Sequence, residues 1–342
     1  MKPLLAIFQA ALAAAAVHAV VLALRGDSRE TAAALLDERA GKIAAVEVHF
    51  APSAEFVSRT YVEFFRQLPV EVKVYVAVEK LEHFEMFSKL TGRAATPVVT
   101  GLPITTWARD RFITGAGGAI IVPPETHSAG PERSNDRLVP YEVARVLGVP
   151  VRVAPFRFDG GDFSRAYGKI FCSSAWAARN PEIPLDQLLA MAESLFGEPV
   201  VYLPEAPNHH VGMIFAPVGD NAFAVGDVRK GASLAPSSLD VDSSDATAAK
   251  FDAVAATIEK AGFRVVRVPV VVTKREFVWM TFTNGVFSDK VVYIPVYGEA
   301  ALDEAGIAAF RALGFDVKPV NVAGTYGHGG TLHCLVHVLK RD

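Results

Sequence analysis

The amino-acid sequence predicts an α/β fold in which one structural unit is repeated five times. In each unit a helical stretch stops at a glycine or a proline, and a short strand rich in β-branched residues follows. A loop with unusual polar residues and another apolar strand complete the unit. The helix stops with their strands share this pattern and lie at 68–74, 147–153, 196–202, 261–266 and 313–318. Their spacing of roughly 50 to 80 residues is typical of a repeat architecture.

The spacing of apolar residues assigns the elements within these units. Helices are predicted at 246–260 and 300–312, upstream of the last two helix stops. Two segments rich in Pro, Ser, Gly and Asp, 124–136 and 231–244, are expected to be solvated connecting loops. The strands expected after the polar loops are 119–122, 169–172, 214–217, 291–296 and 335–339.

The composition favours a protein that binds a small molecule. Of the 342 residues 51% are hydrophobic, and the net charge is −3 without a basic stripe. This charge balance argues against a nucleic-acid partner. The two cysteines, Cys172 and Cys334, form neither a disulfide framework nor a thiolate metal site, although one bridge between them is formally possible. No metal site is expected, and the oligomeric state is left open.

Residues 1–25 differ from the rest of the chain. A basic residue precedes a nearly all-apolar run at 3–24, and small residues at 17–19 surround a cleavage position. These features predict a signal peptide or an N-terminal membrane anchor, then one domain at 26–342 with a short helix starting at 27–30. The protein is expected to be exported or membrane-anchored, and otherwise cytoplasmic. An alanine-rich helix packed on the domain is the alternative.

Polar loops stand at equivalent places in the five units. If the units close into a ring, these loops meet near one axis. They would then bring together two carboxylates, a histidine and the thiol of Cys334. The loops themselves are 106–112, 158–163, 208–213, 276–285 and 329–334.

Cys334 lies just after the paired glycines at 329–330, in an apolar stretch expected to be the last strand. Glycines let the backbone turn sharply or approach a ligand, and a cysteine with histidines elsewhere in the chain is a candidate nucleophile. The alternative is a small buried hydrophobic residue, as we expect for Cys172. The convergence of the polar loops favours the nucleophile for Cys334.

The other polar residues also have structural alternatives. Asp110 could form a surface ion pair with Arg109 or Arg111, but the apolar rings of Trp107 and Phe112 favour a site shielded from water. Adjacency of the two histidines leaves open which one faces the site, and Asp159 could be a turn former. Structural roles are favoured for Asp162, His333 and His337.

Four motifs in this order resemble the guanidine-modifying (pentein) superfamily, nearest to agmatine deiminase and peptidylarginine deiminase-like proteins. They are Trp-x-Arg-Asp at 107–110, Asn-Gly at 284–285, Pro-x-Tyr-Gly at 295–298 and Gly-Gly-x-x-His-Cys at 329–334. The resemblance covers most of the chain after about Ile43. It implies a five-bladed α/β propeller with pseudo-fivefold repeats, and an enzyme that needs no cofactor.

The resemblance also implies roles for individual residues. Cys334 would attack the guanidinium carbon and form a covalent thiouronium. His210 would protonate the leaving amine and then activate water, while Asp159 would orient His210. Asp110 would bind the guanidinium NH groups by paired, charge-assisted hydrogen bonds. The remaining substrate-binding residues would be Trp107, Arg109 and Gly330.

Two departures from the family pattern affect the substrate. Gly212 stands where many relatives carry a second guanidinium-binding aspartate, and Asp159 replaces a glutamate. Glu276 or Asp162 could compensate, and Trp279 suggests a differently shaped pocket. The predicted function is hydrolysis of an agmatine-like, arginine-like or N-substituted guanidine. The alternatives are amidino transfer and a non-catalytic exported binding protein on the same fold; a cysteine protease has little support.

Overall fold

The computed structural model describes residues 32–124 and 131–342. The predicted signal or anchor segment at 1–25 and the helix start at 27–30 lie outside these ranges. Residues Ala33–Asp342 form one compact unit. Within the described ranges, no helix has the length and apolar character needed to cross a membrane.

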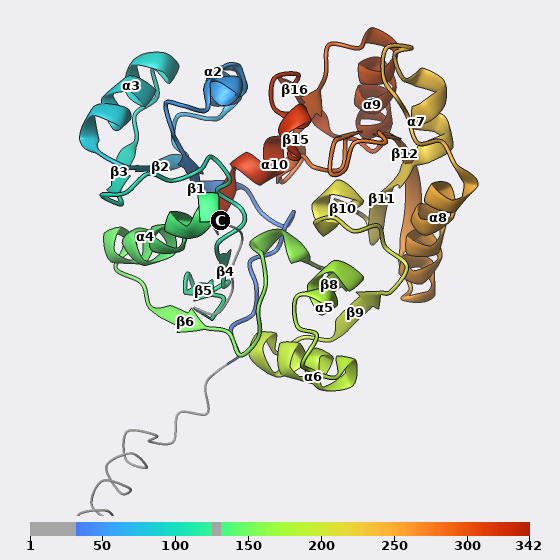
Figure 1. Ribbon diagram of the computed structural model, residues 1–342, viewed down its shortest axis with the longest axis horizontal. Coiled ribbons are helices and arrows are strands. Elements are labelled where there is room, and N and C mark those ends of the chain that lie inside the picture. The colour runs from blue at the N-terminus through green and yellow to red at the C-terminus, as the bar shows by residue number, and fades with distance from the viewer. Residues whose placement is uncertain (1–31, 125–130) are drawn as a thin grey trace, which may run out of the picture. The chain divides into compact units, whose positions relative to one another are not determined.

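Five separate sheets follow one another in chain order around a central region (Figure 1). Four of them are built as strand, strand, helix, strand, with the first two strands antiparallel and the third parallel to the second. The helix is the crossover that a parallel pair needs. The four sets are β4 (Ile113–Thr114), β5 (Ile120–Val122), α4 (Val139–Leu147) and β6 (Val151–Val153); β7 (Phe163–Ala166), β8 (Lys169–Ser173), α6 (Leu185–Phe196) and β9 (Val200–Leu203); β10 (Phe215–Gly219), β11 (Ala222–Asp227), α8 (Asp245–Lys260) and β12 (Arg264–Val272); β14 (Val286–Ser288), β15 (Val291–Val296), α9 (Ala300–Ala312) and β16 (Asp316–Asn321).

The fifth sheet joins the two ends of the described chain. Its last strand, β17 (His337–Arg341), pairs antiparallel with β1 (Ile43–His49), and β1 pairs parallel with β2 (Lys73–Val78) after the crossover helix α2 (Ser58–Gln67). This sheet therefore repeats the unit of the other four, with its first strand supplied by the C-terminal segment. The two ends of the described chain, far apart in the sequence, therefore meet in one sheet. The short segment before β17 lies near the central region that the five sheets surround (Figure 1).

Further short elements connect or extend the units. The helices among them are α3 (Leu81–Thr91), α5 (Ser174–Ala178), α7 (Val228–Leu234) and α10 (Leu332–Leu335), and the strands are β3 (Thr96–Val99) and β13 (Trp279–Thr281). The 3-10 turns are η1 (Glu55–Val57), η2 (Pro131–Leu138), η3 (Gly160–Asp162), η4 (Val211–Met213) and η5 (Tyr326–His328).

Glycines end the helices as the sequence predicts. Gly148 and Gly197 follow α4 and α6 with φ angles of 67° and 71°, a left-handed conformation that costs glycine little. Helices α4, α6, α8 and α9 then pack against strands of their own sheets. Beneath α6, for example, the ring of Phe163 packs edge to face on Trp176 and Phe196, with centroids 5.0 and 5.3 Å apart. This aromatic core holds the start of β7, and with it the turn η3, in place.

The structure corrects three expectations about local elements. Cys334 lies on the one-turn helix α10, and the last strand begins only at His337. The expected loop 231–244 begins with the end of α7, where Gly231 packs so closely on β12 that a Cβ there would lie 1.9 Å from the carbonyl oxygen of Val270. The other expected loop is 124–136. Its residues from 131 onward belong to η2, which contributes Arg133 to the site described below.

Candidate active site

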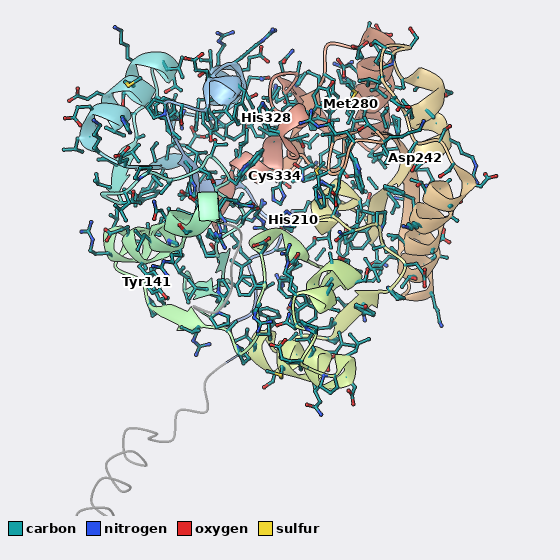
Figure 2. The ribbon with its side chains drawn as sticks, in the orientation of Figure 1. Tyr141, His210, Asp242, Met280, His328 and Cys334 are labelled. Carbon is teal, nitrogen blue, oxygen red and sulfur yellow. The ribbon has the colours of Figure 1, made fainter. Side chains whose placement is uncertain are left out.

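A cavity of about 440 Å³ is lined by most of the residues that the sequence analysis proposed as catalytic or substrate-binding. His210 and Cys334 lie near each other in the middle of the compact unit (Figure 2). They come from the residue before η4 and from α10, so segments far apart in the sequence form the cavity wall. The lining residues are Trp107, Asp110, Arg133, Asp159, Ala175, Ala178, Arg179, Asn208, His209, His210, Phe277, His328, Gly329 and Cys334.

His210 is buried between two carboxylates and the thiol. Its Nδ1 is 3.7 Å from Oδ1 of Asp110, and its Nε2 is 3.5 Å from Oδ2 of Asp159. Burial lowers the pKa of His210, but Asp110 and hydrogen bonds with Asp159 and Cys334 raise it, and the net pKa lies well above the usual value. The resting imidazole is therefore protonated near neutral pH and can donate a proton next to the thiol.

His209 is set apart from His210 in spite of its neighbouring position. Its Nδ1 accepts a hydrogen bond from the backbone NH of His210 at 2.9 Å, and its ring packs against Trp279 with centroids 4.8 Å apart. Burial and then the charge of His210 lower the pKa of His209 to about 3. His209 is therefore neutral, and it fixes the backbone that carries His210.

Cys334 is 5% exposed and opens onto the cavity. Its Sγ donates to Oδ1 of Asn284 at 3.4 Å. The same oxygen accepts hydrogen bonds from Oγ1 of Thr331 at 2.7 Å and from the backbone NH of His333 at 3.1 Å. Asn284 thus holds the short helix that carries the thiol. The sequence motif contained Asn284, but the sequence analysis gave it no role.

Asp110 pairs with Arg133 rather than with Arg109 or Arg111. Oδ2 of Asp110 accepts a hydrogen bond from Arg133, a residue of η2. Oδ1 of Asp110 is buried and accepts no hydrogen bond from the described residues. A buried carboxylate oxygen without a donor is costly unless a ligand supplies one. Arg133 lies in a segment whose composition predicted only a connecting loop, so the sequence gave no signal for it.

Asp159 is held by a second arginine that the sequence analysis missed. Arg179, just after α5, places its guanidinium 2.8 Å from Oδ2 of Asp159 and 2.8 Å from Oδ2 of Asp162. Asp162 also accepts the backbone NH of Asp159 at 2.8 Å and forms a capping box with it. Asp162 therefore has the structural role expected of it, while Asp159 faces His210.

Of Trp107, Arg109 and Gly330, which the resemblance implied as substrate-binding residues, only the first faces the cavity. Trp107 lines the cavity. The guanidinium of Arg109 points elsewhere, because it pairs with Glu38 and donates to the backbone oxygen of Phe163 at 3.3 Å. Gly330 lies beneath Trp107, where a Cβ would come within 2.5 Å of the indole ring. The cavity wall therefore contains Trp107 but neither Arg109 nor Gly330.

The residues expected to be structural are embedded in the interior. His333 pairs with Glu38 at 3.2 Å, and Nε2 of His337 lies 2.9 Å from the hydroxyl of Thr114. Cys172 is fully buried, and burial raises its pKa well above the usual value, with a further contribution from Asp162. Glu276, a possible substitute for the missing aspartate, is exposed and lies outside the cavity wall.

Gly161 makes room for the imidazole of His210. A Cβ at this glycine would lie 2.5 Å from Cγ of His210, well inside van der Waals contact. We expect Gly161→Ala to displace the ring and to lower kcat by about 10²-fold, because a small misplacement of an acid–base group has effects of this order. Gly117→Ala is the control, since nothing lies within 4 Å of its Cβ position. Equal kcat values in the two variants would contradict the role of Gly161.

The described residues contain no group of three or more His, Cys, Asp or Glu side chains arranged to hold a metal ion. The charged groups of the cavity instead form pairs of carboxylates with arginines and with His210. Such a wall offers acceptors for N–H groups, a proton donor and a nucleophile in one place, which are the parts needed for substitution at an amidine carbon.

The comparisons with known proteins agree with this arrangement. A family model described as Porphyromonas-type peptidyl-arginine deiminase matches residues 44–338. No curated protein matches the chain significantly.

Solved structures share the fold at low sequence identity. The agmatine deiminase of C. jejuni is 16% identical with a TM-score of 0.72, over 90% of this chain and 96% of that one. The agmatine deiminase of Enterococcus faecalis is 13% identical with a TM-score of 0.68, over 90% and 96%. A dimethylarginine dimethylaminohydrolase is 12% identical with a TM-score of 0.52, over 86% and 99%. These similarities confirm the predicted pentein fold.

The family model spans most of the 342 residues and includes every residue of the candidate site. The chain therefore belongs to the Porphyromonas-type peptidyl-arginine deiminase family, within the guanidine-modifying (pentein) superfamily that its motifs resemble.

Proposed function

We propose that the protein is a cysteine-dependent deiminase that hydrolyses a C–N bond of a guanidine. One observation carries the proposal. A thiol, a protonated histidine and a buried carboxylate oxygen without a donor line the same cavity, from Cys334, His210 and Asp110. Membership in a deiminase family supports the same chemistry.

The first half-reaction uses the pair of Cys334 and His210. Cys334 loses its thiol proton to solvent and attacks the guanidinium carbon as the thiolate, and a C–S bond forms while a tetrahedral centre develops. His210 then gives its proton to the departing nitrogen, the C–N bond breaks, and an amine leaves. A thiouronium on Cys334 and a neutral His210 remain. The raised pKa of His210 suits this order, because the acid is present before the amine departs.

The second half-reaction regenerates the thiolate of Cys334. A water molecule bonds to the thiouronium carbon and transfers a proton to the now neutral His210. The C–S bond then breaks with its electrons going to Cys334, the second proton of the water is lost to solvent, and a ureido product and the thiolate are formed. Asp159 contributes by orienting His210, since it lies 3.5 Å from Nε2 and is itself fixed by Arg179.

Asp110 is proposed to bind the guanidinium of the substrate. A planar guanidinium offers parallel N–H groups that match a carboxylate, and Oδ1 of Asp110 has no donor among the described residues. Oδ2 already holds the guanidinium of Arg133, so this carboxylate accepts the chemical group in question. The neighbouring structures titled agmatine deiminase support a small guanidine as substrate, of the agmatine-like, arginine-like or N-substituted kind.

We further propose that residues 26–342 act as one catalytic domain whose five sheets are the blades of a propeller. The apolar stretch at 1–25 supports an exported or membrane-anchored protein.

Turnover of guanidines tests the proposal. The protein is incubated with agmatine, arginine, a peptide with an internal or a terminal arginine, and methylated arginines, and the released amine and ureido product are quantified. We expect one class to give stoichiometric amine and ureido product. Bound guanidine without turnover would instead indicate a binding protein, and transfer to an added amine without ureido product would indicate an amidinotransferase.

A further inference from the structure

A second, narrow cavity shares only Cys334 and His210 with the larger one. Its volume of about 20 Å³ is sufficient for one water molecule. Apart from the two shared residues, its polar wall consists of Glu38, Arg109, Ser164, Thr283, Asn284 and His333. The two groups that carry out the chemistry thus face a wide cavity and a separate space of the size of one water molecule.

Gly212 lies at this narrow cavity and leaves it open. The ideal Cβ position of Gly212 is 3.2 Å from Nδ2 of Asn284 and 3.3 Å from Nδ1 of His333. The hydroxyl of Thr283 donates to the backbone oxygen of Gly212 at 2.9 Å, which fixes the glycine there. Any side chain at position 212 would therefore fill space between these two nitrogen atoms.

The two nitrogen atoms have complementary hydrogen-bonding roles. Oδ1 of Asn284 accepts from Thr331, His333 and Cys334, so its amide orientation is fixed and Nδ2 faces the cavity as a donor. Nε2 of His333 is 3.2 Å from a carboxylate oxygen of Glu38. Burial and the charges of Arg109 and Arg341 together lower the pKa of His333 more than Glu38 raises it, so the ring is neutral. Its Nε2 therefore carries the proton, and Nδ1 is an acceptor.

We propose that Gly212 creates a binding site for the hydrolytic water, which Asn284 and His333 hold next to Cys334 and His210. A water slightly further from the backbone than the Cβ position accepts from Nδ2 of Asn284 and donates to Nδ1 of His333. This inference rests on the proposed deiminase function and adds the residues that position its second reactant. Asn284 and His333 are positioning residues for water in this scheme.

The bound water completes the second half-reaction without entering through the substrate cavity. One of its lone pairs forms the bond to the thiouronium carbon, one of its two protons passes to the neutral His210, and the second is lost to solvent when the ureido carbonyl forms. The C–S bond electrons return to Cys334, and the ureido product leaves through the wide cavity. The released amine and the attacking water thus use different sides of the thiol, so the amine need not leave before water arrives.

Gly212→Ala tests the site, because the methyl group would overlap with the adjacent water position and exclude the water, without requiring a positive φ. Rapid mixing of enzyme and substrate separates the two half-reactions. Amine release in the first turnover is expected to stay within about threefold of the wild-type rate. Hydrolysis of the Cys334 adduct is expected to slow by about tenfold or more, since a positioned reactant is lost. The adduct then accumulates and is measured by mass spectrometry of the intact protein.

Two comparisons make the result specific. Gly117→Ala adds a methyl group in open space and should hydrolyse the adduct at the wild-type rate. Hydroxylamine, a small nucleophile that enters from the substrate cavity, should release the accumulated adduct of Gly212→Ala. That rescue would not occur if the substitution had damaged Cys334 or His210.

His333→Gln provides a second variant should Gly212→Ala fold poorly. The amide nitrogen of glutamine can replace Nε2 opposite Glu38, but no acceptor remains at the Nδ1 position. The same selective slowing of hydrolysis is expected. Adduct hydrolysis within twofold of the wild-type rate in a folded variant, or equal slowing of both half-reactions, would overturn the water site. Absence of any amine release from guanidines by the wild-type protein would instead overturn the proposed function itself.

Discussion

Replacement of Cys334 by alanine is expected to reduce guanidine turnover by at least about 10⁴-fold, because no other group can form the covalent intermediate. The described part of the chain has one other cysteine, Cys172, and it lies in a separate core beneath α6. Steady-state assays of amine release measure the loss. Binding of the substrate should persist in the Cys334→Ala protein, since Asp110 and the cavity wall are unchanged.

Cys172→Ala is the matched control for this experiment. Cys172 is fully buried and its raised pKa keeps it a thiol at neutral pH. Its removal should lower the free energy of unfolding by about 1 kcal/mol, as loss of a small buried group does, and leave kcat unchanged. Iodoacetamide at neutral pH should modify Cys334 and spare Cys172, and guanidines should protect Cys334. Residual turnover in Cys334→Ala above one hundredth of the wild-type rate would rule out the covalent mechanism.

The repeated unit could be predicted from the sequence because its signals are local. A helix that stops at glycine and a following β-branched strand are visible within about ten residues, and the structure has strands at all five predicted places. The convergence of the polar loops follows from that repeat alone. The repeat therefore predicts that these loops meet at Cys334, and the resemblance to the guanidine-modifying superfamily then selects Asp110, Asp159 and His210 within them.

The partners of these residues could not be predicted in the same way, because they depend on tertiary contacts. Arg133 comes from a segment expected to be a solvated loop, and Arg179 from one to which the sequence gave no role, yet they fix the two carboxylates of the site. The pairing of Glu38 with Arg109 joins a residue near the start of the described chain to the substrate motif. That pairing turns the guanidinium of Arg109 away from the cavity, although the motif had placed it there.

Cys334 shows how a tertiary contact changes local structure. The apolar, β-branched run from Leu335 onward predicts a strand that includes the thiol. Oδ1 of Asn284 instead accepts the backbone NH of His333 and the hydroxyl of Thr331, and the chain forms one helical turn before β17. The strand that these residues favour therefore begins only at His337, beyond the contacts with Asn284. The turn matters for function, because it points Sγ toward Asn284 and His210.

His210→Gln is expected to lower kcat by about 10³-fold or more, since the variant lacks both the acid for the amine and the base for water. The remaining activity should lose its dependence on a group that titrates above the ordinary histidine range. His83→Gln, a change on the outer helix α3, is the control and should behave as wild type.

The raised pKa of His210 fixes the direction in which stability and activity change with pH. The pKa of His210 is raised in the folded protein, so its proton is held more tightly there than in the unfolded chain, where a histidine titrates near 6.5. The stabilisation is therefore fully present below pH 6.5 and is lost as the pH rises through the raised pKa. Denaturant unfolding at a series of pH values should show that the difference in the free energy of unfolding between wild type and His210→Gln shrinks in that alkaline range.

The wild-type rate should decline over the same range, because the imidazolium that protonates the leaving amine disappears. A decline near pH 6.5, or a stability difference that grows with pH, would show that His210 is not the charged partner of Asp110 and Asp159.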